Sequence, residues 1–174
     1  MNVLYASGIL FYSISPDRTM YFLLGKNNDN KWENFGGGCE ISDRGDPINT
    51  ASRETWEETL GCIYESEQIK NILKNRNVPY VISKTPSNKN YYMYILKIPY
   101  NFLYREKFLN TKNFLYKLEK IDQKFLEMKD IKWVSLDTLK HSIYNKKSII
   151  RLRSIFETNL RENINDILKI TNIE

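Results

Sequence analysis

The sequence predicts a layered α/β domain. An apolar run at 3–14, rich in aromatic and β-branched residues, is typical of a buried strand, and shorter runs of the same kind follow it. One helix with clear start and stop signals lies in the first third, and a long helical pattern closes the chain. Strands and helices of this kind bury their apolar faces by stacking in layers, so we expect residues 1–174 to form a single domain.

Composition narrows the class of protein. With 174 residues, 41% hydrophobic and 27% charged, the chain is globular and long enough to bury a core. It contains no apolar run of about 18 residues and no signal-peptide pattern at its start, which predicts a cytoplasmic protein without a membrane span. Cys39 and Cys62 form neither a disulfide framework nor a zinc spacing, and the single His141 argues against histidine-centred catalysis. The net charge of +5 favours a polyanionic partner.

The first elements follow from local signals. Residues 3–14 are a predicted strand, 15–18 a turn that contains Pro and Asp, and 19–25 the antiparallel partner strand. A polar loop with three asparagines occupies 26–31, and 32–35 form a short strand that leads into Gly36, Gly37 and Gly38. The glycines are therefore expected at a tight turn directly before the first helix.

That helix is predicted between residues 46 and 61. Asp46 is a good N-cap, because its side-chain oxygen can accept a hydrogen bond from the first turn, and Pro47 fits the first helical position. Gly61 is a plausible stop in the left-handed conformation. Apolar and small residues on two faces indicate a helix held between a sheet and another layer.

The second half of the chain contains further strand and helix patterns. We expect the start of a strand at 62–64, a helical or irregular segment at 66–75, and a hairpin of 79–84 with 91–98. Residues 101–120 are basic and aromatic, which fits an amphipathic helix, a long insertion or a basic groove for RNA. A strand at 130–139 leads into a short helix capped by Asp137, and 148–171 form a long helix that packs on the sheet.

Three glutamates carry the strongest chemical signal. Glu54, Glu57 and Glu58 stand at i, i+3 and i+4, so they share one stripe of the helix and repel one another. Arg53 reaches Glu57 at i+4 and offsets part of this repulsion, and a divalent cation would offset the rest. Hard cations such as Mg²⁺ and Mn²⁺ take oxygen ligands. Considered alone, such a run is also typical of a solvated acidic face.

The surrounding residues favour the cation site. The stretch GGGCEISDRGDPINTASRETWEETLG at 36–61 resembles the Nudix box. That box consists of a glycine, five residues of any type, a glutamate, seven residues of any type, and then R-E-U-x-E-E-x-G-U, where U is aliphatic. RETWEE matches its R-E-U-x-E-E segment, and GG with Glu40 matches its opening. Three extra residues precede Gly45, Asp46 stands where the family has Glu, Thr55 occupies the aliphatic position, and Gly61 comes one residue late.

The resemblance implies a fold and an activity. It sharpens the fold class to an α/β/α sandwich, with a mixed β-sheet between helices. It implies a Nudix pyrophosphohydrolase that uses Mg²⁺ or Mn²⁺ to cleave a pyrophosphate bond in a nucleoside diphosphate linked to another moiety. Such a cation would neutralise the diphosphate and lower the pKa of a bound water. The alternative is a non-catalytic module that keeps the fold and binds a nucleotide or RNA.

The resemblance also assigns roles residue by residue. Glu54, Glu57 and Glu58 are the expected metal ligands, with the carbonyl of Gly36 as a further one. Glu57 and Glu54 are also expected to be catalytic, with Glu57 the most damaging single loss, and which carboxylate is the base stays open. Arg53 is expected to orient the carboxylates and the glycine loop.

Substrate contacts are less well determined by the sequence. Glu127 is the nearest match to a further acid that many family members carry before a late strand, and Asp130 is the next. Tyr92 belongs to a tyrosine-rich strand that either packs across the sheet or forms a base-stacking wall, and Arg18 is a further candidate for substrate binding. The basic charge favours capped RNA or another highly anionic substrate, whereas the compact size equally fits a small nucleotide. Nothing in the sequence indicates an oligomeric state.

Overall fold

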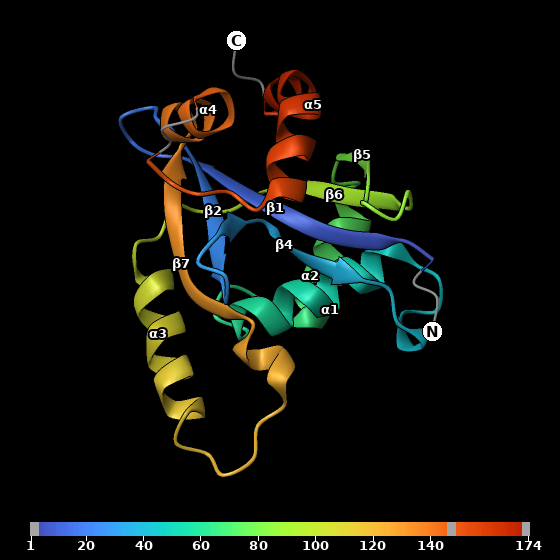
Figure 1. The fold of residues 1–174 in the computed structure, drawn as a ribbon, viewed down its shortest axis with the longest axis vertical. Helices are drawn as coiled ribbons and strands as arrows, with labels where there is room; N and C mark the ends of the chain where they lie inside the picture. Colours follow the sequence, from blue (N-terminus) through green and yellow to red (C-terminus); the bar gives the residue numbers. More distant parts are fainter. Residues whose placement is uncertain (1–3, 146–148, 172–174) are drawn as a thin grey trace.

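The computed structural model describes residues 4–145 and 149–171, which form a mixed β-sheet with helices on both faces (Figure 1). The strands are β1 (Ala6–Ile14), β2 (Met20–Asn27), β3 (Trp32–Glu33), β4 (Phe35–Gly38), β5 (Tyr80–Lys84), β6 (Asn90–Lys97) and β7 (Met128–Ser135). The helices are α1 (Pro47–Thr59), α2 (Ser66–Asn75), α3 (Leu103–Leu115), α4 (Leu136–Tyr144) and α5 (Ser154–Ile170), with short 3₁₀ helices η1 (Ile41–Asp43) and η2 (Gln123–Leu126).

The sheet divides around β1. Strands follow the order β3-β2-β1-β6-β5, and β7 pairs with β2. Among the pairs of strands in the described part of the chain, only β1–β6 is parallel. The C-terminal half of β1 pairs with β2, whereas its N-terminal half pairs with β4, from Ile9 opposite Phe35 to Ala6 opposite Gly38. The glycine strand β4 therefore enters the sheet where β2 leaves β1, which brings it to the middle of the molecule.

Each face of the sheet packs against its own set of helices. Because side chains alternate along a strand, Ile9 and Phe11 of β1 face α1, α2 and α3, and Leu10 faces α4 and α5. Ala51 and Phe108 complete the first core, and Leu160 the second. This arrangement confirms the predicted α/β/α sandwich with a mixed sheet.

Most of the predicted elements are present, and four predictions were wrong. Gly36, Gly37 and Gly38 do not form a tight turn directly before the first helix: they pair with β1 as part of β4, and residues 39–46 separate them from α1. Residues 62–64 form no strand, because Leu60 and Gly61 both adopt left-handed backbone conformations, with φ of 55° and 65°, and the chain turns directly into α2. Ser135 rather than Asp137 caps α4, since its side chain accepts a hydrogen bond from the Thr138 amide.

The C-terminal helix also begins later than expected. Residues 149–153 are not helical, because Leu152 forms a bridge to Trp32 of β3, and α5 begins at Ser154. Ser148 lies outside the described residues. Across 4–145 and 149–171, no helix has the length and apolar character that a membrane span requires.

Candidate active site

Helix α1 positions the three glutamates of the sequence motif. Its start is stabilised by Asp46, whose Oδ1 accepts a hydrogen bond from the Ile48 amide at 2.9 Å, and by Pro47 in the first turn. The helix packs against β1 and β4. At its C-terminal end, Glu58 Oε2 accepts a hydrogen bond from the Gly36 amide at 2.7 Å, which joins the acidic stripe to the glycine strand.

The glycines of β4 allow this close approach. A Cβ added to Gly37 would lie 2.5 Å from the carboxyl carbon of Glu54, and one added to Gly36 would lie 2.5 Å from the Gly8 Cα. Any larger side chain at these two positions must displace Glu54 or separate β4 from β1. The requirement for glycine here is therefore steric.

Arg53 connects the loop, the glycine strand and the glutamates. It donates to both carboxylate oxygens of Asp43 in η1, and its Nη2 also donates to the Gly38 carbonyl at 2.9 Å. Its Nη1 donates to Glu54 at 3.0 Å and to Glu57 at 3.1 Å. These partners hold the pKa of Arg53 above its ordinary value despite partial burial, so the guanidinium stays charged. The predicted orienting role of Arg53 has a geometric basis.

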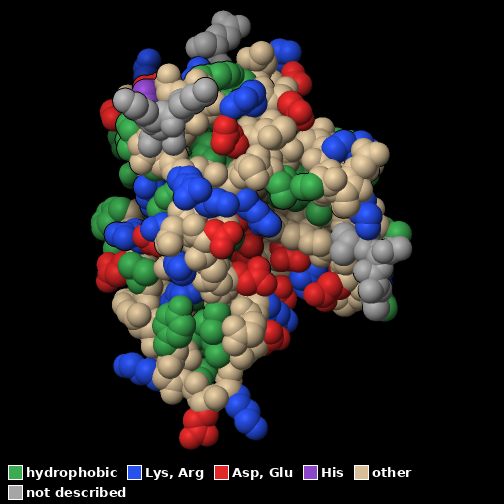
Figure 2. All heavy atoms as spheres, viewed as in Figure 1, with side chains coloured by type: hydrophobic (Ala, Val, Ile, Leu, Met, Phe, Trp, Pro, Cys, Tyr) green, Lys and Arg blue, Asp and Glu red, His purple; other side chains and the backbone are tan. Residues whose placement is uncertain are grey.

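An acidic cavity of about 210 Å³ opens beside this network. We use the name for the space lined by Glu33, Glu58, Glu127, Arg153 and residues 27–29. Glu33 is buried and held from two sides, by Asn27 Nδ2 at 2.7 Å and by Arg153 Nη1 at 2.7 Å. Figure 2 shows acidic side chains gathered near the middle of this face, below a band of Lys and Arg side chains.

Burial and mutual repulsion raise the pKa values of carboxylates in this region. Burial raises the pKa of Glu54 to about 7, with Glu57 and Glu127 adding to the shift and Arg53 opposing it. Burial also raises the pKa of Glu58 well above its ordinary value, and Glu33, Glu54 and Glu127 add to that rise. The pKa of Glu127 is raised by burial and then by Glu57 and Glu33. These shared shifts show that the five glutamates form one electrostatic cluster.

A lysine neutralises part of this cluster. Lys124 of η2 places its Nζ 2.9 Å from Glu57 Oε1, and this contact raises the lysine pKa. Phe125 packs edge-on against Trp56 of α1, with 5.5 Å between the ring centroids, and so holds η2 in place. Within 4–145 and 149–171, no three His, Cys, Asp or Glu side chains converge as a ready-made metal site. Arg53 and Lys124 are the positively charged side chains that contact Glu57.

The structure brings most of the predicted site residues together. Glu54 and Glu57 share hydrogen bonds with Arg53, Glu58 binds the Gly36 amide, and Glu127 lines the acidic cavity. Their roles as metal ligands or catalytic groups stay predictions.

Two predicted substrate-binding residues lie apart from this cluster. Tyr92 packs against Tyr5 and Tyr80, with centroid distances of 6.1 and 5.9 Å, on the sheet face that α1 and α2 cover. Arg18 is exposed in the β1–β2 turn, whereas the glycine strand pairs with the other end of β1. Their roles in substrate binding stay predictions as well.

Sequence reasoning missed four residues of this region: Glu33, Asp43, Lys124 and Arg153. Glu33 lies three residues before Gly36 in WENFGGG, and this position near the glycines was the available signal. Asp43 lies in the segment between Glu40 and Gly45 that departs from the family pattern. Lys124 and Arg153 carry no local signal, because their partners lie far away in the sequence.

Comparison with known proteins adds the fold family. No protein-family model matches the sequence, and no curated protein matches it. The NUDIX domain of Shewanella oneidensis NrtR complexed with ADP ribose is similar in structure, with 12% identity, a TM-score of 0.51, and coverage of 97% of this chain and 90% of that chain. A C. elegans Ap4A hydrolase in a binary complex is similar with 16% identity, a TM-score of 0.51, and coverage of 94% and 98%. The chain therefore has the Nudix fold.

Proposed function

We propose that this protein is a divalent-cation-dependent hydrolase that cleaves a pyrophosphate bond in a nucleoside diphosphate linked to another moiety. The observation that carries the proposal is the electrostatic cluster of Glu33, Glu54, Glu57, Glu58 and Glu127. Glu33, Glu58 and Glu127 line the acidic cavity, and Glu58 also binds the glycine strand. Glu33, Glu57 and Glu58 are buried. Buried like charges are unfavourable for folding, and such arrangements are typical of functional sites. A diphosphate adds further negative charge, so the site needs a cation.

The donor set fits Mg²⁺ or Mn²⁺. All its side-chain donors are carboxylate oxygens, which hard cations prefer. Burial, and then repulsion from neighbouring glutamates, raises the pKa values of Glu54 and Glu58, and a bound cation would favour their charged forms. Glu54, Glu57 and Glu58, with the Gly36 carbonyl, would hold it. When bound, the cation neutralises the diphosphate and lowers the pKa of a water ligand.

The chain's own residues supply orientation and proton transfer. Arg53 fixes Glu54 and Glu57 relative to the glycine strand through its contacts with Asp43 and Gly38. A carboxylate of the cluster accepts the proton of the attacking water, and efficient transfer needs a pKa near the working pH. Arg153 can contact a phosphate at the edge of the acidic cavity.

The comparisons and the charge support two classes of substrate. One similar structure holds ADP ribose and the other is named an Ap4A hydrolase, which supports a nucleotide substrate. Capped RNA is the second candidate, because the net charge is +5 and the segment around α3 exposes Phe102, Phe114 and Tyr116. A module that binds a nucleotide without cleaving it is the non-catalytic alternative.

Product release with Mg²⁺ and with Mn²⁺ tests the proposal, run side by side on ADP ribose, dinucleoside polyphosphates and cap-labelled RNA. Glu57→Gln is expected to fold and to lose at least about 10²-fold in rate, as expected for a key acid–base or metal-binding group. Glu67→Gln, at an exposed acid of α2, is the matched control and should keep full activity. Near-normal turnover by Glu57→Gln would contradict the assignment, and nucleotide binding without product release would favour the non-catalytic module.

A further inference from the structure

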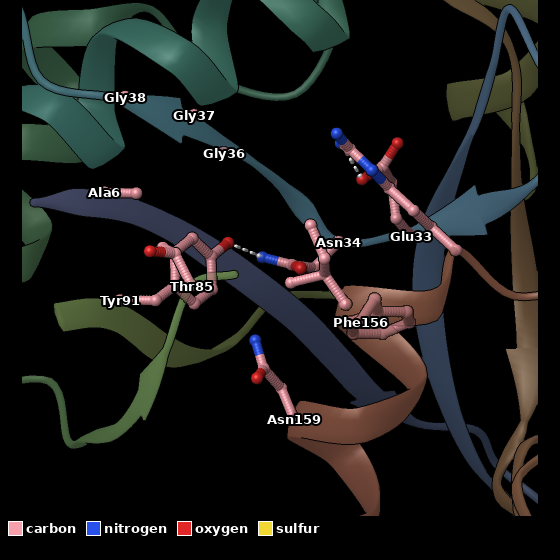
Figure 3. Close-up of a pocket in the computed structure, with 12 residues that line it drawn as sticks. Ala6, Glu33, Asn34, Gly36, Gly37, Gly38, Thr85, Tyr91, Phe156 and Asn159 are labelled. Carbon is pink, nitrogen blue, oxygen red and sulfur yellow. Dashed lines mark hydrogen bonds and ion pairs between the residues drawn. The ribbon is translucent and has the colours of Figure 1, made fainter. Parts of the chain in front are cut away.

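A second cavity, of about 190 Å³, lies directly beside the acidic one. We call it the neutral cavity. Figure 3 shows it between the glycine strand and the first turns of α5, and its walls include Ala6, Asn34, Thr85, Tyr91, Phe156 and Asn159. The neutral and acidic cavities share Glu33 and Arg153, so a ligand in one can extend into the other.

Asn159 of α5 is the unusual group in this cavity. Asn159 is only 2% exposed, yet its side-chain amide makes no hydrogen bond to any residue in the described part of the chain. Figure 3 shows this amide pointing away from α5 into the space before Tyr91 and Asn34. The amide atoms are not fully enclosed by protein, so they face the cavity, where a ligand or water can pair with them.

The other polar groups of the cavity are already paired. Asn34 Nδ2 donates to the Tyr91 hydroxyl at 2.6 Å, and Gly8 and Gly36 leave room for that hydroxyl, because a Cβ at either would lie within 2.7 Å of it. Glu33 is paired with Arg153 at 2.7 Å. The wall that remains is apolar and aromatic, with Phe156 on one side. The cavity thus combines an apolar surface with the Asn159 amide, which has no hydrogen-bond partner in the described part of the chain.

We propose that the neutral cavity binds the nucleobase of the substrate and that the Asn159 amide recognises an adenine edge. This inference rests on the proposed function. A volume of about 190 Å³ is below the roughly 300–1,000 Å³ of pockets for drug-sized ligands, so it suits one ring system rather than a whole dinucleotide. An asparagine amide places a donor beside an acceptor, which matches the adjacent N6 donor and N7 acceptor of adenine.

Arg153 connects the base to the reacting phosphates. Its backbone amide donates to the Trp32 carbonyl at 3.0 Å, and the Trp32 amide donates to the Arg151 carbonyl at 2.8 Å. These bonds hold the start of α5 against β3 and keep the guanidinium between the two cavities. A base beside Asn159 would therefore direct its phosphates past Arg153 towards the glutamates.

Equilibrium binding of nucleoside monophosphates in EDTA tests the proposal. AMP should bind the wild type more tightly than IMP, which carries an oxygen in place of the N6 amine. Asn159→Leu, which keeps the side-chain volume, should weaken AMP binding by at least about 10-fold and abolish the preference over IMP. The matched control is Asn165→Leu, at an exposed position of the same helix, which should leave both affinities unchanged. Equal binding of AMP and IMP to the wild type, or an unchanged preference in Asn159→Leu, would overturn the proposal.

A second variant covers the case in which Asn159→Leu fails to fold. Ile155→Trp enlarges another residue of the cavity wall and should exclude AMP while residue 159 stays asparagine. A folded Ile155→Trp protein with wild-type AMP affinity would contradict the nucleobase site. Since this assay contains no divalent cation and involves no cleavage, it can fail while Mg²⁺-dependent hydrolysis succeeds, and the reverse, so the two proposals are judged separately.

Discussion

Asp43 holds the guanidinium of Arg53 in a fork of two hydrogen bonds, from Nε to Oδ1 at 3.1 Å and from Nη2 to Oδ2 at 2.9 Å. The Asp43 side chain is only 3% exposed, and its Oδ2 also accepts from the Thr50 hydroxyl and the Glu40 amide. One edge of Arg53 is thereby fixed to the loop, which leaves Nη1 to meet Glu54 and Glu57.

Replacing Asp43 should therefore affect stability and activity together. Asp43→Asn leaves a partly buried guanidinium without its main charged partner, and we expect the free energy of unfolding to fall by about 2 kcal/mol or more. Hydrolysis should fall as well, because Arg53 no longer orients the glutamates. Urea denaturation and rate measurements check this, with Asp46→Asn as control, since Asn caps a helix as well as Asp does. A fully stable and active Asp43→Asn protein would contradict the role given to the pair.

Gly37→Ala should reduce hydrolysis while it leaves the free energy of unfolding nearly unchanged. Its Cβ would meet the end of the Glu54 side chain, which can rotate away, so we expect a stability change within about 1 kcal/mol but at least about a 10-fold loss of hydrolysis. Gly45→Ala is the reciprocal control: Gly45 has a φ of 74° and open space around it, so the change should cost about 1 kcal/mol and leave hydrolysis intact. Full activity in Gly37→Ala would show that the Glu54 position is not critical.

Lys124 should compete with a bound cation. Its ammonium lies 2.9 Å from Glu57, so Lys124→Met removes one positive charge from the cluster and should increase Mn²⁺ affinity several-fold at low salt. Because the side chain is 40% exposed, the gain should shrink as ionic strength rises. Mn²⁺ titration by electron paramagnetic resonance measures this directly, with the exposed Lys120→Met as control. An unchanged or reduced affinity in Lys124→Met would refute the competition.

Lys112, which lies away from the candidate site, should make the free energy of unfolding depend on pH. Its ammonium is buried and donates to the carbonyls of Leu126 and Met128, and burial lowers its pKa from 10.5 to about 8. Between these values the unfolded chain binds more protons at Lys112 than the folded protein does, so this group makes stability rise with pH. The effect is on the order of 1–3 kcal/mol over the full window.

The measurement is the difference in free energy of unfolding between the wild type and Lys112→Met. The wild type should gain stability relative to the variant as the pH rises from about 8 towards 10.5. Taking the difference removes the opposite contribution of tyrosines such as Tyr94, whose pKa burial raises to about 12. A difference that stays flat over this window would show that Lys112 titrates normally.

The features that the sequence alone determined are local ones. The spacing of Glu54, Glu57 and Glu58 places them on one helical stripe whatever the rest of the chain does, and Asp46 and Pro47 start that helix. The strand and helix patterns were sufficient for a layered α/β domain, and the resemblance of residues 36–61 to the Nudix box supplied the mixed sheet between helices. Each of these signals acts within a few residues, so no tertiary information was needed.

Only the tertiary structure decided which distant residues join the glutamates. Arg153 and Lys124 meet Glu33 and Glu57 through the docking of α5 and η2, which no local pattern encodes. The tyrosine-rich strand β6 shows the same division. The sequence identified this strand only as tyrosine-rich. In the structure, strand pleating places Tyr91 at the neutral cavity and Tyr92 on the opposite face, against Tyr5. Which face becomes the cavity depends on strand register and helix packing, and these are set by contacts across the whole chain.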